Sequence, residues 1–437
     1  MTRLEALLSA GLFLGVGLAL GCAGTERPST AGLPPTPWAS RALPEAQGEI
    51  KTSPDGRKMQ VRYRGWTTED FGQFRTYAYD DPRPAPAVSR LSMPQVKGDP
   101  REGRKLFLSR AKGPCTGCHL IPGDDVWPAG NVGPDLSTFG DRNLPDDYVF
   151  TQVYDSRNFF PHTTMPPWGT TGALKPEEIV HIVAYLQTLK GPLSPEKDPN
   201  RNPDTRAKPV GFGDNLDPTN NPGIVLAEGA MSLWNKRGPA GKACGDCHAG
   251  GPAKAMKGVA TRYPNYVKAF QRVMSIEDFL TVHAPGTTGL PMLAESDENL
   301  STTMLIKMQS NGMPVQVDLV SPEARAAFER GRASFWKRVG QRDHACADCH
   351  TKGAGRGADK FLGGRLLADV DAGLTKHFPL WRTSVGAVWD MRKRMQWCMT
   401  PLGMNMLPAD AVEYAELELF LTSFDNGKPM SVPGIRH

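Results

Sequence analysis

The chain has 437 residues, with 51 Lys and Arg against 46 Asp and Glu, so its formal net charge is only +5. So small a charge gives no reason to expect a nucleic-acid partner. The length corresponds to about three domains, and 46 Gly with 39 Pro predict that much of the chain is loop.

The first 22 residues have the pattern of an export signal. Arg3 precedes an apolar run from Leu7 to Leu20, which is too short to be a stable membrane span. We therefore expect residues 1–22 to be a signal peptide and the protein to be periplasmic. Cys22 ends the run, and residues 19–22 resemble a bacterial lipoprotein cleavage box. Lipidation of Cys22 would tether the protein to a membrane surface; plain cleavage nearby is the alternative.

Composition shifts and the positions of three cysteine motifs divide the rest of the chain into five segments. A Pro-rich extension to which we assign no function comes first, and a Pro-rich linker separates the first motif-containing unit from the second. The segments are the extension at 23–92, the first unit at 93–191, the linker at 192–223, the second unit at 224–320 and the third unit at 321–437.

The pattern Cys-x-x-Cys-His occurs once in each of the three units. Its two thiols can bond to the two vinyl groups of a haem, and its His can ligate the iron. Chance would give roughly 0.003 matches in a chain with this Cys and His content. Zinc is the alternative, but it usually takes four protein ligands from paired knuckles, and a His after every pair favours haem. We expect three covalently bound haem c groups. The attachment residues are Cys115, Cys118, Cys244, Cys247, Cys346 and Cys349, and the first iron ligands are His119, His248 and His350.

Helices with one apolar face are predicted around these motifs. Each face repeats apolar residues three or four positions apart, as an amphipathic helix does. The faces contain Ile179, Ile182, Val183 and Leu186 in the first unit, Leu300, Met304 and Met308 in the second, and Phe328 with Phe335, then Val412, Ala415 and Leu419, in the third. We predict a mainly α fold of three cytochrome c-like domains in series, joined by Pro- and Gly-rich linkers and preceded by a loop-rich extension.

A methionine on a loop is the candidate for the sixth ligand of the first iron. Met165 stands 46 residues after His119, before the closing helix of the first unit. Ligation by Met and His raises a haem potential and suits electron transfer. His162 is a rival ligand, and a Met buried in the core is the structural alternative. We favour Met165.

Six of the 8 cysteines belong to the three motifs, which leaves Cys22 and Cys398 outside them. Arg392, Lys393 and Arg394 come just before Cys398. In a helix, Arg394 and Cys398 would stand at positions i and i+4 on one face, and a nearby guanidinium favours a thiolate. Burial as a small hydrophobic residue is the alternative. The basic neighbours favour a functional thiol.

Several segments in fixed order resemble a known family. Residues 133–136, 153–157 and 165–169 are similar to SoxX, a monohaem cytochrome of the thiosulfate-oxidising Sox system. The remainder resembles the two-haem form of its partner SoxA, at residues 262–264, 309–314, 340–350, 378–382 and 394–398. From residue 93 to 437, the chain resembles SoxX and SoxA fused head to tail.

The resemblance implies an activity and roles for two residues. In SoxA the Cys that matches Cys398 ligates the catalytic haem and carries an extra sulfur as a persulfide. The Arg that matches Arg394 is associated with the substrate, and a planar cationic fork suits a sulfonate. The implied enzyme is an L-cysteine S-thiosulfotransferase. It couples thiosulfate to a cysteine of the SoxYZ carrier and passes two electrons to a soluble cytochrome c.

The second unit departs from the family pattern. Two-haem SoxA proteins usually present a Cys as the sixth ligand of their first haem, and here His283 occupies that position. We expect His283 to be the ligand, with Met274 and Met256 as fallbacks. Two other functions stay open: a dihaem-type thiosulfate dehydrogenase that forms tetrathionate, and a multihaem electron-transfer protein without catalysis. Turnover with and without the carrier would separate them.

Overall fold

The computed structural model describes most of the three haem units and a small part of the extension. The described residues are 49–52, 58–61, 90–109, 112–113, 115–123, 129–160, 163–190, 219–339, 343–351, 360–363, 365–383, 385–399 and 411–436. The expected signal peptide with Cys22, His162 and most of the linker lie outside them. In the extension, β1 (Glu49–Thr52) pairs antiparallel with β2 (Lys58–Val61). Within the described residues no helix is long and apolar enough to cross a membrane.

The first unit is a small helical domain around its haem motif. Asp99 caps its first helix by accepting a hydrogen bond from the Arg101 amide, 2.8 Å away. The first and last helices pack closely, because a Cβ at Gly103 would lie 1.9 Å from the His181 carbonyl oxygen. The elements are α3 (Pro100–Leu108), η1 (Cys115–Gly117), η2 (Phe139–Arg142), α4 (Asp146–Tyr154), η3 (Ser156–Asn158) and α5 (Pro176–Thr188). The predicted closing helix is confirmed as α5, with Ile179, Ile182 and Val183 buried.

The second unit combines helices with one short hairpin. Ser275 and Asp278 form a reciprocal cap at the start of α10, each side chain accepting from the other's amide. The elements are α6 (Pro222–Gly229), α7 (Met231–Asn235), α8 (Cys244–Cys247), α9 (Gly251–Ala255), η5 (Ala260–Arg262), β3 (Asn265–Val267), η6 (Lys268–Phe270), β4 (Arg272–Met274), α10 (Ile276–Thr287) and α11 (Asp297–Met308). The predicted helix with Leu300 and Met304 is confirmed as α11.

The third unit has two long packed helices and several short strands. A Cβ at Gly331 would lie 2.0 Å from the Glu416 carbonyl oxygen, so α12 and α15 pack almost backbone to backbone. Both helices were predicted. The elements are α12 (Pro322–Trp336), α13 (Cys346–His350), β5 (Lys360–Leu362), β6 (Arg365–Leu367), η7 (Val370–Ala372), β7 (Leu380–Arg382), β8 (Ala387–Trp389), α14 (Met391–Met399), α15 (Val412–Ser423) and β9 (Gly434–Arg436). Strand β7 pairs antiparallel with β8 and parallel with β9.

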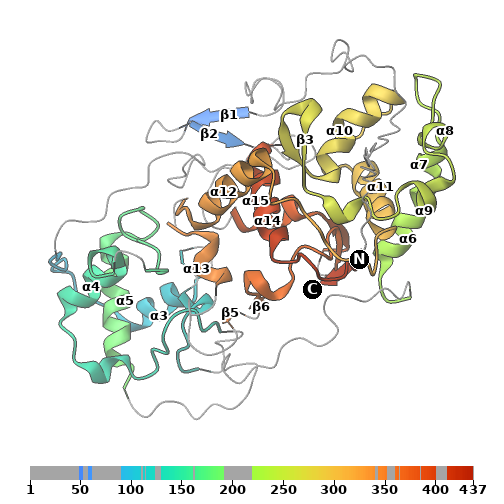
Figure 1. Ribbon diagram of the computed structural model, residues 1–437. Coiled ribbons are helices and arrows are strands. Elements are labelled where there is room, and N and C mark those ends of the chain that lie inside the picture. The colour runs from blue at the N-terminus through green and yellow to red at the C-terminus, as the bar shows by residue number, and fades with distance from the viewer. Residues whose placement is uncertain are drawn as a thin grey trace, which may run out of the picture.

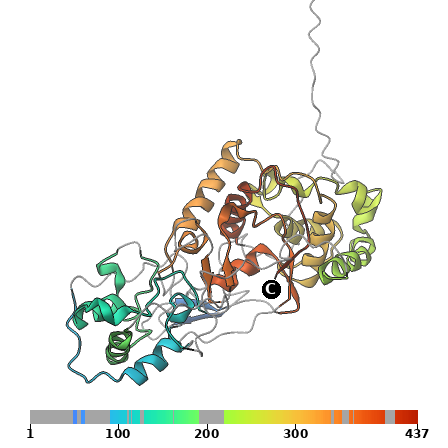
Figure 2. The ribbon, with the colours of Figure 1, turned by 90° about the horizontal axis from the view of Figure 1, so that it is seen from below.

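The second and third units share a hydrophobic core. One continuous cluster contains Val273, Ile276 and Leu305 from the second unit together with Ala415 and Leu419 from α15. Both views show the third unit between the other two, with the first unit against the side that carries α13 and β5 (Figures 1 and 2). The cluster therefore makes the two C-terminal units one packed body, while the first unit has a core of its own.

A buried cluster of charged residues also crosses between the second and third units. Arg392 on α14 is 1% exposed and donates two hydrogen bonds to the carboxylate of Asp278 on α10. It also donates to the Ser275 hydroxyl at 3.1 Å. Lys307 on α11 pairs with Glu277 at 3.0 Å. Since Arg392 and Asp278 are both buried and pair across the two units, the cluster fixes the position of α14 relative to α10.

Acidic groups outnumber basic groups in this cluster, and this affects their protonation. Burial raises the pKa of Glu418 to about 8, and the negative charge of Glu277 adds to the shift. Burial likewise raises the pKa of Asp390 to about 6, again with a contribution from Glu277. The groups that face one another are Glu277, Asp278, Asp390 and Glu418 against Lys307 and Arg392. Glu418 therefore keeps its proton at neutral pH.

The raised pKa of Glu418 predicts a pH-dependent stability. The unfolded chain loses this proton near pH 4.5 and the folded chain near pH 8, so the stability that Glu418 contributes falls as pH rises through this window. Glu418→Gln removes the dependence. Its stability relative to wild type should grow by up to about 1.4 kcal/mol per pH unit and level off above the folded pKa, in urea unfolding monitored at several pH values. The exposed Glu329→Gln is the control; equal pH slopes for wild type and Glu418→Gln would contradict the prediction.

Candidate functional site

The first haem motif places its histidine with one ring nitrogen already bonded. Nδ1 of His119 lies 2.8 Å from the carbonyl oxygen of Pro134, and donation to this oxygen leaves Nε2 for a metal. A Cβ at Gly133 would lie 2.4 Å from the imidazole, so only glycine lets the loop approach the ring. Burial lowers the pKa of His119 and so favours the neutral form that a ligand needs. These residues fit a haem iron ligated by His119.

The third motif repeats this arrangement. Nδ1 of His350 lies 2.7 Å from the carbonyl oxygen of Ala368, which again leaves Nε2 for a metal. Burial lowers the pKa of His350. The motif forms the short helix α13. Cys346 and Cys349 are three positions apart in this helix and therefore lie on the same face. This motif also fits a covalently bound haem.

In the second unit two histidine rings face each other. The ring centroids of His248 and His283 are 6.1 Å apart. Two imidazoles on opposite sides of one metal have about this spacing, because each metal–nitrogen bond is about 2 Å long. His283 also stacks on Phe279, with centroids 4.9 Å apart. The fallback ligand Met256 lies in the hydrophobic core, and Met274 is fully buried. The geometry therefore favours His283 as the partner of His248.

Met165 lies on a loop that is held from two sides. The Ser156 hydroxyl donates to the Met165 carbonyl oxygen at 3.0 Å, and the Met165 amide donates to the Thr163 hydroxyl at 3.1 Å. The side chain packs against the core of the first unit while staying partly exposed. Its rival His162 lies outside the described residues. The role of Met165 as an iron ligand stays a prediction.

Cys398 and Arg394 are in contact on α14. Nη1 of Arg394 lies 2.9 Å from Sγ of Cys398, as their spacing of four predicts. The guanidinium also lies over the Trp397 ring, 5.2 Å from its centroid. A cationic donor of this kind stabilises a thiolate or another anionic sulfur. The pair is therefore suited to hold sulfur in a charged form.

The thiol of Cys398 also lies beside the third haem motif. Burial raises the pKa of Cys349 to about 12, and the nearby Cys118, Asp348 and Cys398 add to the shift. The structure thus brings Cys398 close to the motif that contains His350. Of the three basic residues that precede the thiol in the sequence, Arg392 is bound to Asp278 on α10.

Zinc is the alternative occupant of these motifs. Among the described residues, no group of three or more His, Cys, Asp or Glu side chains is arranged to hold a metal ion. A structural zinc site needs four such ligands.

The facing histidines give a test of the second site. If His248 and His283 ligate one iron, low-temperature spin resonance should show a bis-imidazole signal that His283→Met changes. The signal from a thiolate-ligated third iron should stay, since Cys398 lies in another unit. Phe279→Leu, which removes only the stacked ring, is the matched control and should keep the bis-imidazole signal. If His283→Met leaves every signal unchanged, His283 is only a core residue.

Comparison with known proteins agrees with a cytochrome. The family model described as SoxA/TsdA, cytochrome c domain, matches residues 229–315. The model described as cytochrome C oxidase, cbb3-type, subunit III, matches residues 98–186. The crystal structure of SoxXA from P. pantotrophus is 26% identical, covers 50% of this chain and 80% of its own, and has a TM-score of 0.45.

Two curated relatives decide the family. The L-cysteine S-thiosulfotransferase subunit SoxA of Pseudaminobacter salicylatoxidans is 30% identical over 221 residues, which are 49% of this chain and 73% of the relative. The subunit of the same name from Hydrogenobacter thermophilus is 30% identical over 216 residues, 49% of this chain and 83% of the relative. Together with the matched cytochrome c domain, they show that the chain belongs to the SoxA family of cytochromes with covalently bound haem c.

Proposed function

We propose that this chain is a thiosulfate-oxidising L-cysteine S-thiosulfotransferase that combines a SoxX-like and a SoxA-like part. It couples thiosulfate to a cysteine of a SoxYZ-type carrier and passes electrons to a soluble cytochrome c. The observation that carries the proposal is the Arg394–Cys398 contact of 2.9 Å beside the third haem motif. The relatives named as subunits of this enzyme support it.

Three haem c groups are part of the proposal. His119 with Met165, His248 with His283, and His350 with Cys398 would ligate the three irons. When bound, each haem accepts one electron at a time. The matched cytochrome models support the first two sites. The third rests on the Cys346–His350 motif and on the hydrogen bond of His350 to Ala368.

The reaction assigns a separate task to each residue of the pair. Joining thiosulfate to the carrier thiol forms one sulfur–sulfur bond, releases one proton and removes two electrons. Arg394 can hold the sulfonate through charge-assisted hydrogen bonds. Cys398 carries the transferred sulfur, and the adjacent guanidinium stabilises negative charge on it. Both side chains are half-buried, and the proposal requires that a carrier segment reach their exposed part.

The proposed location follows from the N-terminal pattern. Residues 1–22 would direct export to the periplasm, where c-type haems are attached, and a lipidated Cys22 would tether the protein to a membrane surface. Both statements rest on the sequence alone.

A second function deserves a parallel assay. The matched domain is described jointly for SoxA and TsdA, and a thiosulfate dehydrogenase would form tetrathionate without a carrier. A protein without catalysis would only relay electrons. The Arg394–Cys398 contact favours sulfur chemistry over a relay, and dependence on the carrier separates the two catalytic functions.

The pair on α14 is tested by substitution. Cys398→Ala should abolish thiosulfate oxidation that depends on the carrier protein, because it removes the thiol that holds the transferred sulfur. Arg394→Lys should lower kcat/KM by about tenfold or more, since one bidentate contact to the anion is worth about 1.5–3 kcal/mol. The measurement is reduction of cytochrome c with thiosulfate, with and without carrier.

Haem content and a neighbouring variant are the controls. Both proteins should retain a mass increase of three haems over the polypeptide, and Lys393→Ala, next to the pair on the same helix, should keep most of the activity. Wild-type turnover by Cys398→Ala would refute the mechanism. Tetrathionate formation without carrier would instead support the dehydrogenase.

A further inference from the structure

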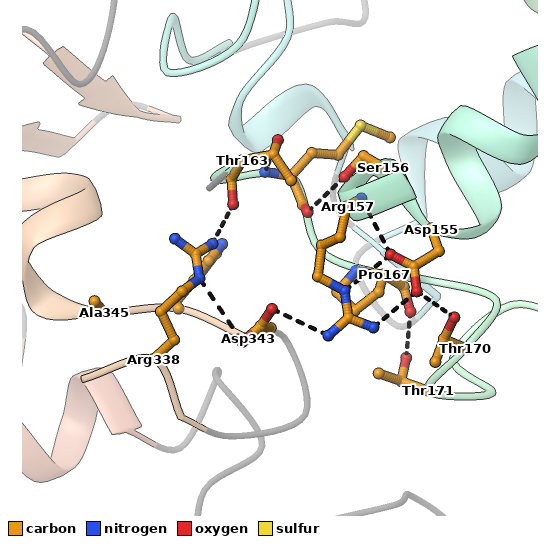
Figure 3. A network of polar contacts seen from close by, with 12 residues as sticks. Asp155, Ser156, Arg157, Thr163, Pro167, Thr170, Thr171, Arg338, Asp343 and Ala345 are labelled. Carbon is orange, nitrogen blue, oxygen red and sulfur yellow. Dashed lines mark hydrogen bonds and ion pairs between the residues drawn. The ribbon is translucent and has the colours of Figure 1, made fainter. Parts of the chain in front are cut away.

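The two sequence segments that resemble different proteins meet in space. Arg157 of the first unit is 6% exposed, and its Nη1 lies 3.2 Å from Oδ2 of Asp343 in the third unit. The same guanidinium binds Asp155 of its own unit through two hydrogen bonds of 2.7 and 2.9 Å. Figure 3 shows Arg157 between the two carboxylates. We call Asp155, Arg157, Arg338 and Asp343 the charged joint.

The second arginine of the joint connects the ligand loop of one unit to the haem motif of the other. Arg338 donates to the carbonyl oxygen of Thr163, two residues before Met165. Its Nη1 lies 3.0 Å from Oδ1 of Asp348, which stands inside the third haem motif, and its Nε lies 3.7 Å from Asp343 (Figure 3). His344 also contacts this loop, through Nε2 at 2.5 Å from the Thr164 carbonyl oxygen.

A second contact joins the first haem motif to the β5 hairpin. Asn131 and Phe361 exchange hydrogen bonds, from the Asn131 amide at 3.1 Å and from the Phe361 amide at 2.8 Å. The Gly363 amide donates to the carbonyl oxygen of Gly117, which is part of the motif, at 2.8 Å. Gly130 leaves no room for a Cβ here, because it would lie 2.6 Å from the Phe361 carbonyl oxygen. The first motif is thus held directly against the third unit.

Burial makes the charged joint sensitive to the loss of one partner. Burial alone would lower the pKa of Arg157, but hydrogen bonds and charge from Asp155 and Asp343 raise it overall. Removing one member of such a buried network leaves the others desolvated and unpaired, which is strongly unfavourable. Because Asp343 lies between the two arginines, it is the member whose loss most weakens the contact between units.

We propose that the charged joint is a positioning device that fixes the first haem-binding unit on the third, with Asp343 as its central positioning residue. It keeps the two haem motifs at a constant short separation, so that electrons exchange between these units rapidly and within one chain. The proximity of Cys118 to Cys349 supports this separation. The proposal rests on the proposed function only in taking both motifs to hold haem.

The first experiment measures association without any substrate. A protease recognition sequence is placed between residues 195 and 210 of the haem-loaded full chain, which is then cleaved and passed over a sizing column. Cleaved wild type should elute as one complex, whereas cleaved Asp343→Arg should separate into two fragments. Glu178→Arg, which breaks the 2.8 Å ion pair with Lys112 inside the first unit, should elute like wild type.

The second experiment measures exchange between the units in the uncleaved protein. A pulse of less than one equivalent of reductant reduces only part of the haem sites. The absorbance change that follows, as electrons move between the sites of the first and third units, should be at least tenfold slower in Asp343→Asn than in wild type or Glu178→Gln. Asp343→Glu should recover part of the rate, and haem content should be unchanged in all of them.

The proposal is overturned if cleaved wild type separates, if cleaved Asp343→Arg stays associated, or if Asp343→Asn exchanges electrons at the wild-type rate. None of these measurements uses thiosulfate or the carrier. Loss of the proposed activity in wild type would therefore leave the result on the joint unaffected.

Discussion

The buried pairing of Arg392 with Asp278 is the interaction on which the candidate site depends. Arg392 lies on α14, six residues before Cys398, and Asp278 lies on α10, five residues before His283. The pair therefore connects the helix with the sulfur site to the helix with the second-unit ligand candidate. Breaking a buried pair of this kind costs about 3–5 kcal/mol. The contact between Arg394 and Cys398 lies within α14, so the Arg392–Asp278 pair sets where α14 presents this contact relative to α10.

Buried charges also position the first unit against the third unit. The second and third units are joined by a shared apolar core with charges inside it, whereas the first unit meets the third through a charged joint and backbone hydrogen bonds. A shared hydrophobic core holds two units together permanently. A polar contact fixes the orientation of one unit on another and requires less apolar surface on each unit. The third motif lies beside the contact with the first unit, because Arg338 binds both Asp348 of the motif and the Thr163 carbonyl oxygen.

Local rules explain what the sequence allowed us to predict. The helices α5, α11, α12 and α15 follow from apolar spacing. The contact between Arg394 and Cys398 follows from a helical spacing of four. His248 and His283 lie next to each other, as the family resemblance led us to expect. Local rules could not predict this pair, because 35 residues separate the two histidines in the sequence.

The features that escaped prediction depend on distant partners. Arg392 and Asp278 are 114 positions apart, and Arg157 and Asp343 are 186 apart. No periodic pattern reports such pairs, so Arg392 was grouped with its basic neighbours rather than with a buried carboxylate. The short strands β7, β8 and β9 were also missed, because three-residue strands carry too little alternation to register.

The central claim is that Cys398 carries sulfur during turnover, and the mass of the peptide that contains it tests this most directly. The peptide is isolated from native protein without reductant, before and after incubation with thiosulfate and carrier, and again after treatment with a strong nucleophile. The account predicts a form heavier by one sulfur atom that the nucleophile removes. A peptide that shows only the unmodified thiol under every condition would contradict it.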